Sequence, residues 1–542
     1  MDGLMMDYQL TIPSMLRRTE CMFGHKEIVS RRPDRSIERS NYMQALSRAR
    51  RLASGLEKLG VTRGDRVATL CWNHLRHLEA YFGVPSSGAV LHTLNLRLHI
   101  DELAYIAEHA GDRVLIVDHS LSPLAQELRR RVALEHVIVI RESPEMTLPD
   151  GMIDYEAVVV SGEPDYQYPE LPESEAAMMC YTSGTTGRPK GVLYSHRSQC
   201  LHTLGVLLSD VSGITERDAV LAVVPMFHAN AWGLPFSAAV SGARQVMPGP
   251  HLDPASLVEL FERERVTMSA GVPTIWLGIL QYLDANPTRH DLTPLRRMLV
   301  GGAAVPEPLI RAFQDRHGLS IMQGWGMTET SPVASVSKVP SDVENASSDV
   351  QFAYRAKAGL PLPFVEIRAR CDDGKLAPWD AETMGELEVR GPWVVGSYYN
   401  SPGSEERFTS DGWFRTGDIV TIDSRGCITI QDRAKDLVKS GGEWISSVAL
   451  EGALLSHPDV AEAVVIALPH EKWDERPVAV IVPREGRTPT VESVRAHLAP
   501  NFAKWWLPDD VILVESIPRS GTGKYLKNVL RDRFRTRLLA AT

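Results

Sequence analysis

The strongest constraint on the fold of this chain is the alternation of helical and strand patterns over residues 41–160. Apolar residues recur with helical spacing from Ala45 to Leu59, whereas Val67 to Leu70 and Val114 to Val117 are short apolar runs. Amphipathic helices that alternate with fully apolar strands are typical of β-α-β units, in which helices cover a largely parallel sheet. The same alternation returns over residues 219–302. We therefore expect an α/β fold.

The pattern changes twice further along the chain. From Pro361 it becomes a series of short strands and turns, which predicts a β-rich subdomain. Beyond Asp432 helices and strands mix over a length that suits a small α+β domain. The predicted organisation is a large N-terminal domain of parallel α/β sheets with the β-rich subdomain, residues 1–432, followed by a small mobile α+β C-terminal domain, residues 433–542.

Composition narrows the class of protein. A chain of 542 residues with 44% hydrophobic and 23% charged residues is long enough for at least two globular domains. The net charge of -10 argues against a general nucleic-acid binder. The six cysteines form no C-x-x-C pair, which predicts reduced, mostly buried thiols.

The N-terminus bears on localisation. Residues 1–7 carry acids where a signal peptide needs cations, and no apolar run approaches the ~18 residues of a spanning helix. We expect a cytoplasmic protein without a membrane span, and we leave peripheral membrane contact open.

The stretch Thr182 to Gly191 combines hydroxyl residues, glycines and two cations within one short loop. Glycines let backbone N–H groups approach an anion, the hydroxyls donate hydrogen bonds, and Lys190 supplies a mobile charge. A Walker A loop is disfavoured because no hydroxyl residue follows the lysine. The loop therefore predicts a polyphosphate site, and the alternative for such a loop in isolation is a plain surface turn.

Four further motifs follow that loop in a fixed order: Gly324 to Glu329, Gly412 to Asp418, Asp432 to Asp436 and Pro518 to Lys524. Together with residues 181–192 they resemble the motifs of the acyl-adenylate-forming superfamily, and the resemblance extends from Tyr42 to Arg533. This superfamily activates a carboxylate with ATP and Mg²⁺, and many of its members then transfer the acyl group to CoA.

The resemblance implies roles for individual residues. Glu329 and Thr182 would hold Mg²⁺, Thr328 would contact the α-phosphate, and Trp325 would lie against adenine. Asp418 and Arg433 would hold the ribose. The full set of implied nucleotide-binding residues is Thr182, Ser183, Gly184, Thr185, Thr186, Gly187, Lys190, Gly302, Ala303, Gln323, Gly324, Trp325, Gly326, Met327, Asp418 and Arg433.

Lys524 is the candidate that carries the chemistry. Joining a carboxylate to a phosphate brings two anions together, so a flexible ammonium that touches both lowers the barrier. Without the motif around it, Lys524 would be an exposed lysine of a basic tail. The implied catalytic residues are Lys524, His228, Thr328 and Glu329.

The resemblance also implies two steps with different domain orientations. Lys435 would be the pivot, and CoA would reach the site past a segment that the rotation brings in. The implied residues of this second step are Lys435, Lys439, Gly441, Gly442 and Trp444.

The acyl group would lie among small and apolar residues, namely Trp232, Gly233, Val272, Gly301 and Val305. No acid among them would bind a substrate amine, so an amino-acid-activating domain is disfavoured. Residues 228–232, 439–447 and 502–508 are most similar to bacterial medium- and long-chain fatty acid-CoA ligases. The alternatives are a CoA ligase for a short acid such as 3-methylthiopropionate, and a non-catalytic nucleotide- or lipid-binding homologue. We also expect a homodimer, since the arm before Ser40 resembles a dimerising segment.

Overall fold

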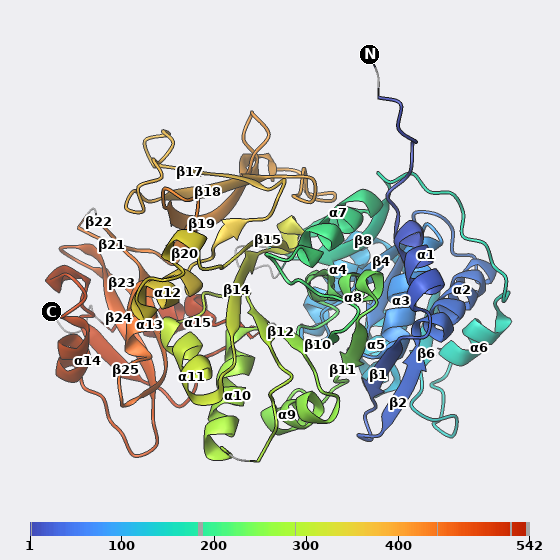
Figure 1. Cartoon of the computed structure of the whole chain (residues 1–542), viewed down its shortest axis with the longest axis horizontal. Helices are drawn as coiled ribbons and strands as arrows, with labels where there is room; N and C mark the ends of the chain where they lie inside the picture. The colour runs from blue at the N-terminus through green and yellow to red at the C-terminus, as the bar shows by residue number, and fades with distance from the viewer. Residues whose placement is uncertain (2, 183–187, 288, 442, 521–522, 538–542) are drawn as a thin grey trace.

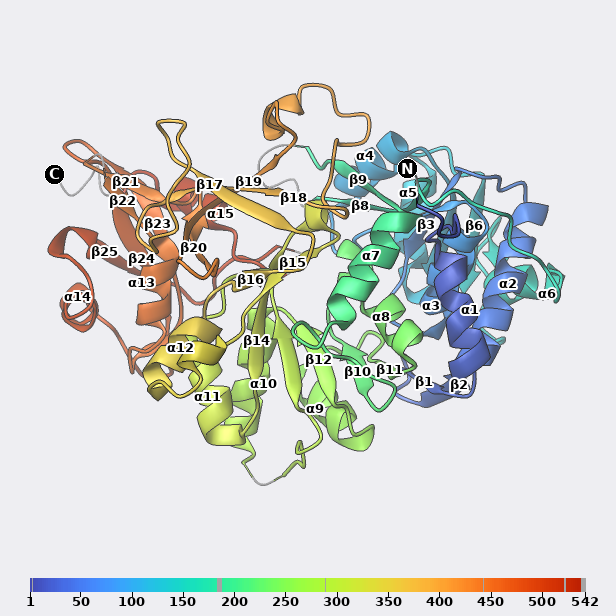
Figure 2. The ribbon, with the colours of Figure 1, turned by 45° about the horizontal axis from the view of Figure 1, so that its top comes forward.

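The computed structural model of the chain describes residues 1–542 except 2, 183–187, 288, 442, 521–522 and 538–542. Among these described residues the strands form four sheets of seven, nine, four and five strands. The seven-stranded sheet lies at one end of the molecule, the nine-stranded sheet in the middle, and the five-stranded sheet at the other end (Figures 1 and 2).

The seven-stranded sheet has the strand order β7-β6-β5-β3-β4-β8-β9, and all its pairs are parallel except β8 with β9. The end strand β9 pairs antiparallel with β8, and the polyphosphate loop is the segment of the chain that connects these two strands. The strands are β3 (Arg66–Leu70), β4 (Val90–Thr93), β5 (Asp112–Asp118), β6 (His136–Ile140), β7 (Ile153–Asp154), β8 (Ala176–Tyr181) and β9 (Gly191–Ser195).

The nine-stranded sheet has a parallel centre, β14-β13-β12-β10-β11-β1, and antiparallel edges. The carboxyl ends of its central strands lead into the loops that carry residues 223–233, 272 and 301–305. The strands are β1 (Glu27–Arg31), β2 (Ile37–Asn41), β10 (Ala219–Ala222), β11 (Arg244–Met247), β12 (Met268–Gly271), β13 (Arg297–Val300), β14 (Ile321–Gly326), β15 (Val333–Val336) and β16 (Leu360–Pro361).

The helices that cover these sheets form where the sequence supplies a capping residue and an apolar stripe. In α2, the Asn41 side chain accepts a hydrogen bond from the Gln44 N–H, which caps the N-terminus, and an apolar stripe from Ala45 to Leu56 is buried. Figure 2 shows α1, α2 and α3 side by side, and α3 contacts β4 and β8 of the seven-stranded sheet. The helices are α1 (Ile12–Phe23), α2 (Tyr42–Lys58), α3 (Leu75–Ser86), α4 (Ile100–Ala110), α5 (Ser122–Arg129), α6 (Tyr155–Ser161), α7 (His196–Leu207), α8 (Leu234–Ser241), α9 (Pro254–Arg263), α10 (Pro273–Ala285), α11 (Glu307–His317) and α12 (Ser348–Arg355).

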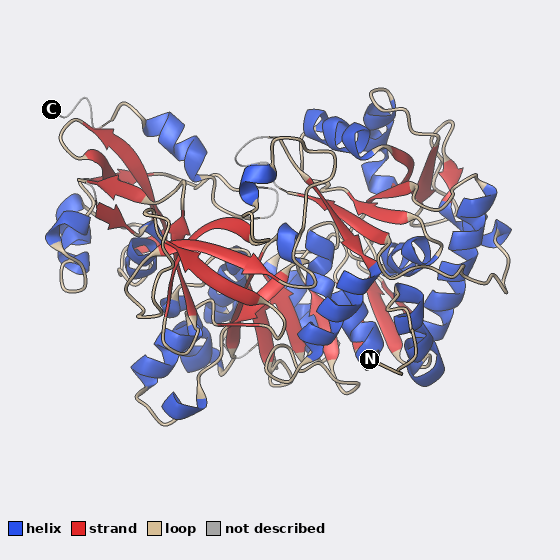
Figure 3. Ribbon diagram, turned by 90° about the horizontal axis from the view of Figure 1, so that it is seen from above, coloured by secondary structure: helices blue, strands red, loops and turns tan. Residues whose placement is uncertain are grey.

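The third sheet is antiparallel, in the order β17-β18-β19-β20, and it is the predicted β-rich subdomain. Figure 3 shows the molecule from the side of this sheet. Its strands are β17 (Glu366–Arg370), β18 (Gly385–Arg390), β19 (Phe414–Ile422) and β20 (Ile428–Arg433).

The last sheet forms a small α+β unit with three helices. Residues 434–437 connect β20 to its first strand, so the chain leaves one sheet and enters the other within four residues. Its elements are β21 (Val438–Ser440), β22 (Glu443–Ile445), α13 (Ser447–Leu454), β23 (Val460–His470), β24 (Asp474–Pro483), α14 (Val491–Leu498), β25 (Asp510–Leu513) and α15 (Lys527–Phe534).

These elements confirm the predicted α/β class, with its β-rich part and its C-terminal α+β part. Four of the six thiols are buried and none is in a disulfide, as predicted from their spacing. Within the described ranges no helix is long and apolar enough to cross a membrane.

Candidate active site

The polyphosphate loop is closed at its base by two hydrogen bonds between its end residues. The Thr182 N–H donates to the Lys190 carbonyl at 3.0 Å, and the Lys190 N–H donates to Thr182 Oγ1 at 3.1 Å. The Lys190 ammonium lies 4.8 Å from the centre of the Tyr398 ring, in a cation–π contact. The predicted phosphate ligands Ser183, Gly184, Thr185, Thr186 and Gly187 lie outside the described residues.

Thr328 and Glu329 lie on a buried 3₁₀ turn, η3 (Thr328–Thr330), directly after β14. The Tyr398 hydroxyl donates to Glu329 Oε1 at 2.6 Å, and the Tyr194 hydroxyl donates to the Thr328 carbonyl at 2.7 Å. Sequence reasoning missed Tyr398, although it touches both Glu329 and Lys190. An aromatic residue in an irregular loop gave no spacing from which this contact could be predicted.

The same turn offers chemistry that fits a hard divalent cation. In the described part of the chain the partner of the buried Glu329 carboxylate is a tyrosine hydroxyl, and not a lysine or arginine. A buried carboxylate without a neutralising cation favours binding one, and Mg²⁺ prefers carboxylate and hydroxyl oxygens. Glu329 is therefore a suitable candidate to hold Mg²⁺ together with phosphate oxygens, and the same role for Thr182 stays a prediction.

Asp418 joins two other predicted nucleotide residues. Its Oδ2 accepts a hydrogen bond from Trp325 Nε1 at 2.9 Å, and its Oδ1 lies 2.7 Å from Arg433 Nε. Asp418 is buried, and it pairs in register with Arg433 across β19 and β20. Since each carboxylate oxygen has a further lone pair, both oxygens can still accept hydroxyl donors such as those of a ribose.

Lys524 reaches this region from the small domain. A methyl group added to Gly302 would lie 3.6 Å from Lys524 Cε, and Thr274 Oγ1 donates to the carbonyl of Gly523 at 3.5 Å. Burial lowers the pKa of Lys524 to about 8, and the positive charge of Arg433 acts in the same direction. Asp418 and Glu329 act in the opposite direction, so Lys524 lies within the electrostatic range of both acids.

His228 lies near the same ammonium. Burial lowers its pKa to about 3, and the charge of Lys524 adds to that effect. The imidazole is therefore neutral at physiological pH, and it can position a carboxylate or adenylate by hydrogen bonding but not by charge.

Trp232, one of the predicted acyl residues, lies in an unusual backbone segment. Ala229, Asn230, Ala231 and Trp232 all have φ values between 42° and 58°, although none of them is glycine. Such φ values cost about 1–2 kcal/mol per residue, so the surrounding packing must hold this segment. A methyl group on Gly301 would lie 3.2 Å from Trp232 Cη2, which shows that the indole lies against Gly301.

The other acyl candidates lie close by. Val272 Cγ1 would be 3.3 Å from a methyl group on Gly302, and the Val305 N–H donates to Gln323 Oε1 at 2.8 Å. The remaining predicted residues lie on these neighbouring segments. Gly233 follows Trp232, Ala303 lies in the loop after β13, Gly324 and Gly326 lie on β14, and Met327 lies between β14 and η3.

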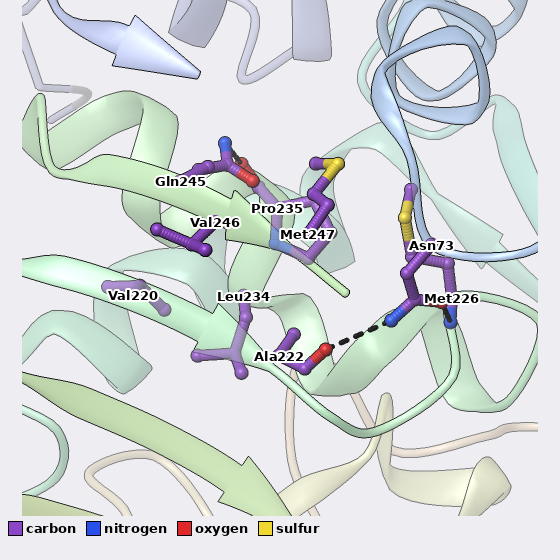
Figure 4. A pocket seen from close by; sticks show the side chains of 9 residues that line it. All are labelled: Asn73, Val220, Ala222, Met226, Leu234, Pro235, Gln245, Val246 and Met247. Atoms are coloured by element: carbon purple, nitrogen blue, oxygen red, sulfur yellow. Dashed lines mark hydrogen bonds between the residues drawn. The ribbon is translucent and has the colours of Figure 1, made fainter. Parts of the chain in front are cut away.

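A small, mostly apolar cavity lies between α8 and the strands β10 and β11 (Figure 4). Asn73 Nδ2 donates to the Ala222 carbonyl at 3.0 Å and so closes one side. Its free volume of about 10 Å³ is near the minimum for one water molecule. It is lined by Asn73, Val220, Ala222, Met226, Leu234, Pro235, Gln245, Val246 and Met247.

Of the residues predicted for the second step, Lys435 lies near enough to Lys524 for its charge to act on the pKa of that lysine, whereas Lys439 and Trp444 lie on a separate hairpin. Lys435 is exposed in the connection after β20, and Lys439 and Trp444 form a cation–π pair across the β21–β22 hairpin. Figures 1 and 2 show this hairpin on the outer part of the small domain. The Gly441 N–H donates to the Trp473 carbonyl of the same domain at 2.8 Å, and Gly442 lies outside the described residues.

Comparisons with known proteins bear on this arrangement. The family model described as "AMP-binding enzyme" matches residues 21–399, and the model of its C-terminal domain matches residues 449–524. A long-chain-fatty-acid–CoA ligase of Thermus thermophilus is 50% identical over 98% of this chain and 97% of its own length. A medium-chain-fatty-acid–CoA ligase of Ectopseudomonas oleovorans is 43% identical over 100% of this chain and 99% of its own length.

A third relative, a 3-methylmercaptopropionyl-CoA ligase of Ruegeria pomeroyi, is 43% identical over 98% of this chain and 99% of its own. Among solved structures, the anthranilate CoA ligase AuaEII in complex with anthranoyl-AMP has a TM-score of 0.87 at 25% identity, and 99% of each chain is covered.

Proposed function

The chain belongs to the AMP-binding enzyme family, and from this premise we propose that it is a fatty acid-CoA ligase for medium to long chains. In the first step a carboxylate oxygen attacks the α-phosphate of ATP and pyrophosphate leaves. In the second step the CoA thiol attacks the acyl carbonyl of the adenylate and AMP leaves. The observation that carries this proposal is the position of Lys524 beside Gly302, where the charges of Asp418 and Glu329 act on its ammonium.

In the first step the ammonium of Lys524 neutralises the carboxylate and the α-phosphate where they meet. Asp418, Arg433 and Trp325 would orient the nucleoside, and neutral His228 would position the carboxylate. Thr182 and Glu329 would hold Mg²⁺, which supplies charge neutralisation at the phosphates when it is bound.

The second step would use a different orientation of the small domain, in which Lys524 leaves the site and the CoA thiol reaches the same carbonyl. The short connection 434–437 and the location of Lys439, Gly441 and Trp444 away from Lys524 support a rotation about Lys435. The domain boundary at 432 and 433 is proposed on the same basis. After the rotation the β21–β22 hairpin would line the path of CoA.

The substrate class rests on the apolar residues around Trp232 and on the names of the relatives. None of the predicted acyl residues lines the small cavity in Figure 4, so its volume sets no limit on the length of the acyl chain. A short thioether acid is the second candidate, because one relative is a 3-methylmercaptopropionyl-CoA ligase.

We further propose a cytoplasmic homodimer. Leu4, Met5 and Met6 are almost fully exposed in an extended N-terminal arm, and apolar side chains of this kind favour a protein partner. Sedimentation of the full chain beside a variant without residues 1–9 tests this point, since loss of the dimer is expected on removal of the arm.

The function itself is tested by CoA- and ATP-dependent AMP release across carboxylates from 3-methylthiopropionate and butyrate through decanoate to palmitate. Maximal kcat/KM at decanoate or longer supports the fatty acid-CoA ligase. A maximum at the thioether acid would replace it by the second candidate, and no AMP release with any acid would contradict both.

A further inference from the structure

Lys527 follows Lys524 by three residues and begins helix α15, yet its side chain points into the small domain and is only 11% exposed. Its ammonium lies 2.7 Å from Glu451 Oε1 of α13 and donates a hydrogen bond to Ser447 Oγ. Glu451 Oε1 also accepts the N–H of Val465 from β23. The end of the Lys524 turn is therefore fixed by a buried ion pair.

Ser447 continues this chain of contacts to the other sheet. Its N–H donates to Asp432 Oδ2 at 2.9 Å, and its hydroxyl donates to the same oxygen. Asp432 is 2% exposed and lies on β20, and its Oδ1 accepts the N–H of Arg433 at 2.8 Å. Lys527 is thus connected to the residue next to the arginine that holds Asp418.

The other side of the Lys524 turn has its own anchor, which does not involve β20. Arg519 Nη2 donates to Glu462 Oε1 at 2.7 Å, and the Tyr525 hydroxyl donates to Glu462 Oε2 at 3.2 Å. Glu462 lies on β23 within the small domain. Of these two anchors, the one at Lys527 links the turn to the strand that carries Arg433.

We propose that Lys527 is a positioning residue that, through Ser447 and Asp432, aligns Lys524 with Arg433 for the adenylation step. The inference rests on the proposed function and names a residue outside the set that would touch substrate. Lys527 itself touches neither ATP nor the acid. Its effect is on where Lys524 lies relative to the bound nucleotide, and a displacement of about 1 Å there can lower the rate by about a hundredfold.

The contact between Ser447 and Asp432 should matter for the first step and not for the second. Asp432 belongs to the β17–β20 sheet, whereas Ser447 and Lys527 belong to the small domain, and residues 434–437 lie between them. A rotation of the small domain about Lys435 would separate Asp432 from Ser447. The buried bridge therefore belongs to the orientation in which Lys524 reaches the site.

The test compares the two half-reactions in Lys527→Met, Lys527→Arg and Ser447→Ala. Carboxylate-dependent ATP–pyrophosphate exchange reports the first step, and thioester formation from CoA and a synthetic acyl-adenylate reports the second. The matched control is Arg537→Met, which removes an exposed ion pair with Asp510 in the same domain.

We expect Lys527→Met to lower exchange by roughly tenfold to a hundredfold and to leave thioester formation within about threefold of wild type. Lys527→Arg should restore part of the exchange because it keeps the buried cation. Ser447→Ala keeps the ion pair with Glu451 and so should fold even where Lys527→Met does not, and it should show the same split on a smaller scale.

If wild type is active, two results would overturn this inference and leave the proposed function intact. One is an equal loss of both half-reactions in Lys527→Met, and the other is no loss of exchange in that variant. A wild-type protein that is inactive in both half-reactions would overturn the proposed function and the inference together.

Discussion

Arg433 Nε lies 2.7 Å from Asp418 Oδ1, and the two residues face each other in register at the end of β20 and in β19. The pair couples the last residue before the interdomain connection to the carboxylate proposed to hold the ribose. The charge of Arg433 also lowers the pKa of Lys524, although burial is the larger cause, so one residue acts on both the proposed ribose carboxylate and the proposed catalytic lysine.

Asp418→Asn should raise the KM for ATP by about tenfold or more, since hydrogen bonds to a charged group contribute about 1.5–3 kcal/mol. The amide also leaves Arg433 without its carboxylate partner. Steady-state kinetics with ATP varied measure the effect. Asp411→Asn serves as the control, because Asp411 pairs with Arg368 at an exposed position near the same sheet. An unchanged KM in Asp418→Asn would contradict the ribose role.

The low pKa of Lys524 predicts an alkaline limit for adenylation. The folded pKa of about 8 lies below the ordinary value of 10.5, so the ammonium loses its proton as the pH rises through about 8. The kcat/KM for ATP in the exchange reaction, which reports the free enzyme, should therefore fall above that pH. The rate of thioester formation from a supplied acyl-adenylate should not fall in this way above pH 8. An exchange rate that stays constant well above pH 8 would count against the assignment.

Tyr398→Phe removes the hydroxyl that donates to Glu329 but keeps the ring beside Lys190. We expect adenylation to fall by about tenfold, since a hydrogen bond to a buried carboxylate contributes about 1.5–3 kcal/mol. A titration with Mg²⁺ shows whether the half-saturating concentration also changes. Tyr399→Phe, at the adjacent position, is the matched control and should behave as wild type.

Trp232→Ala should alter the choice of carboxylate more than the rate with the best one. The indole is buried and lies against Gly301, so its removal opens space beside the proposed acyl group. The loss of a buried tryptophan should also lower stability by about 3–5 kcal/mol. The ratio of kcat/KM for palmitate to that for butyrate is the measurement, and an identical ratio in wild type and variant would exclude Trp232 from the acyl site.

Much of the fold was predictable because its patterns are local. The N-capped, amphipathic α2 and the apolar strand β3 carry their periodicity within a few residues, and the change of pattern at Pro361 marks the antiparallel sheet. The strand orders of the two large sheets could not be predicted, since they depend on contacts between residues far apart in the chain.

The residues of the candidate site also fall into those that the sequence could predict and those that it could not. Motif resemblance singled out Lys524, Glu329 and Asp418, and in the structure the charges of both acids act on the Lys524 ammonium. Tyr398 and Lys527 could not be identified, because each acts through a partner distant in sequence. The left-handed segment before Trp232 was also unpredictable, since its alanines do not favour positive φ and only the surrounding packing holds it.

The central claim is that Lys524 serves the adenylation step alone, and the most direct measurement compares both half-reactions in wild type and Lys524→Ala. We predict that exchange of pyrophosphate into ATP falls by about 10²–10³, because a charge that stabilises the transition state is lost. Thioester formation from CoA and a supplied acyl-adenylate should remain close to wild type. Equal losses in both half-reactions, or full exchange activity without Lys524, would contradict the account.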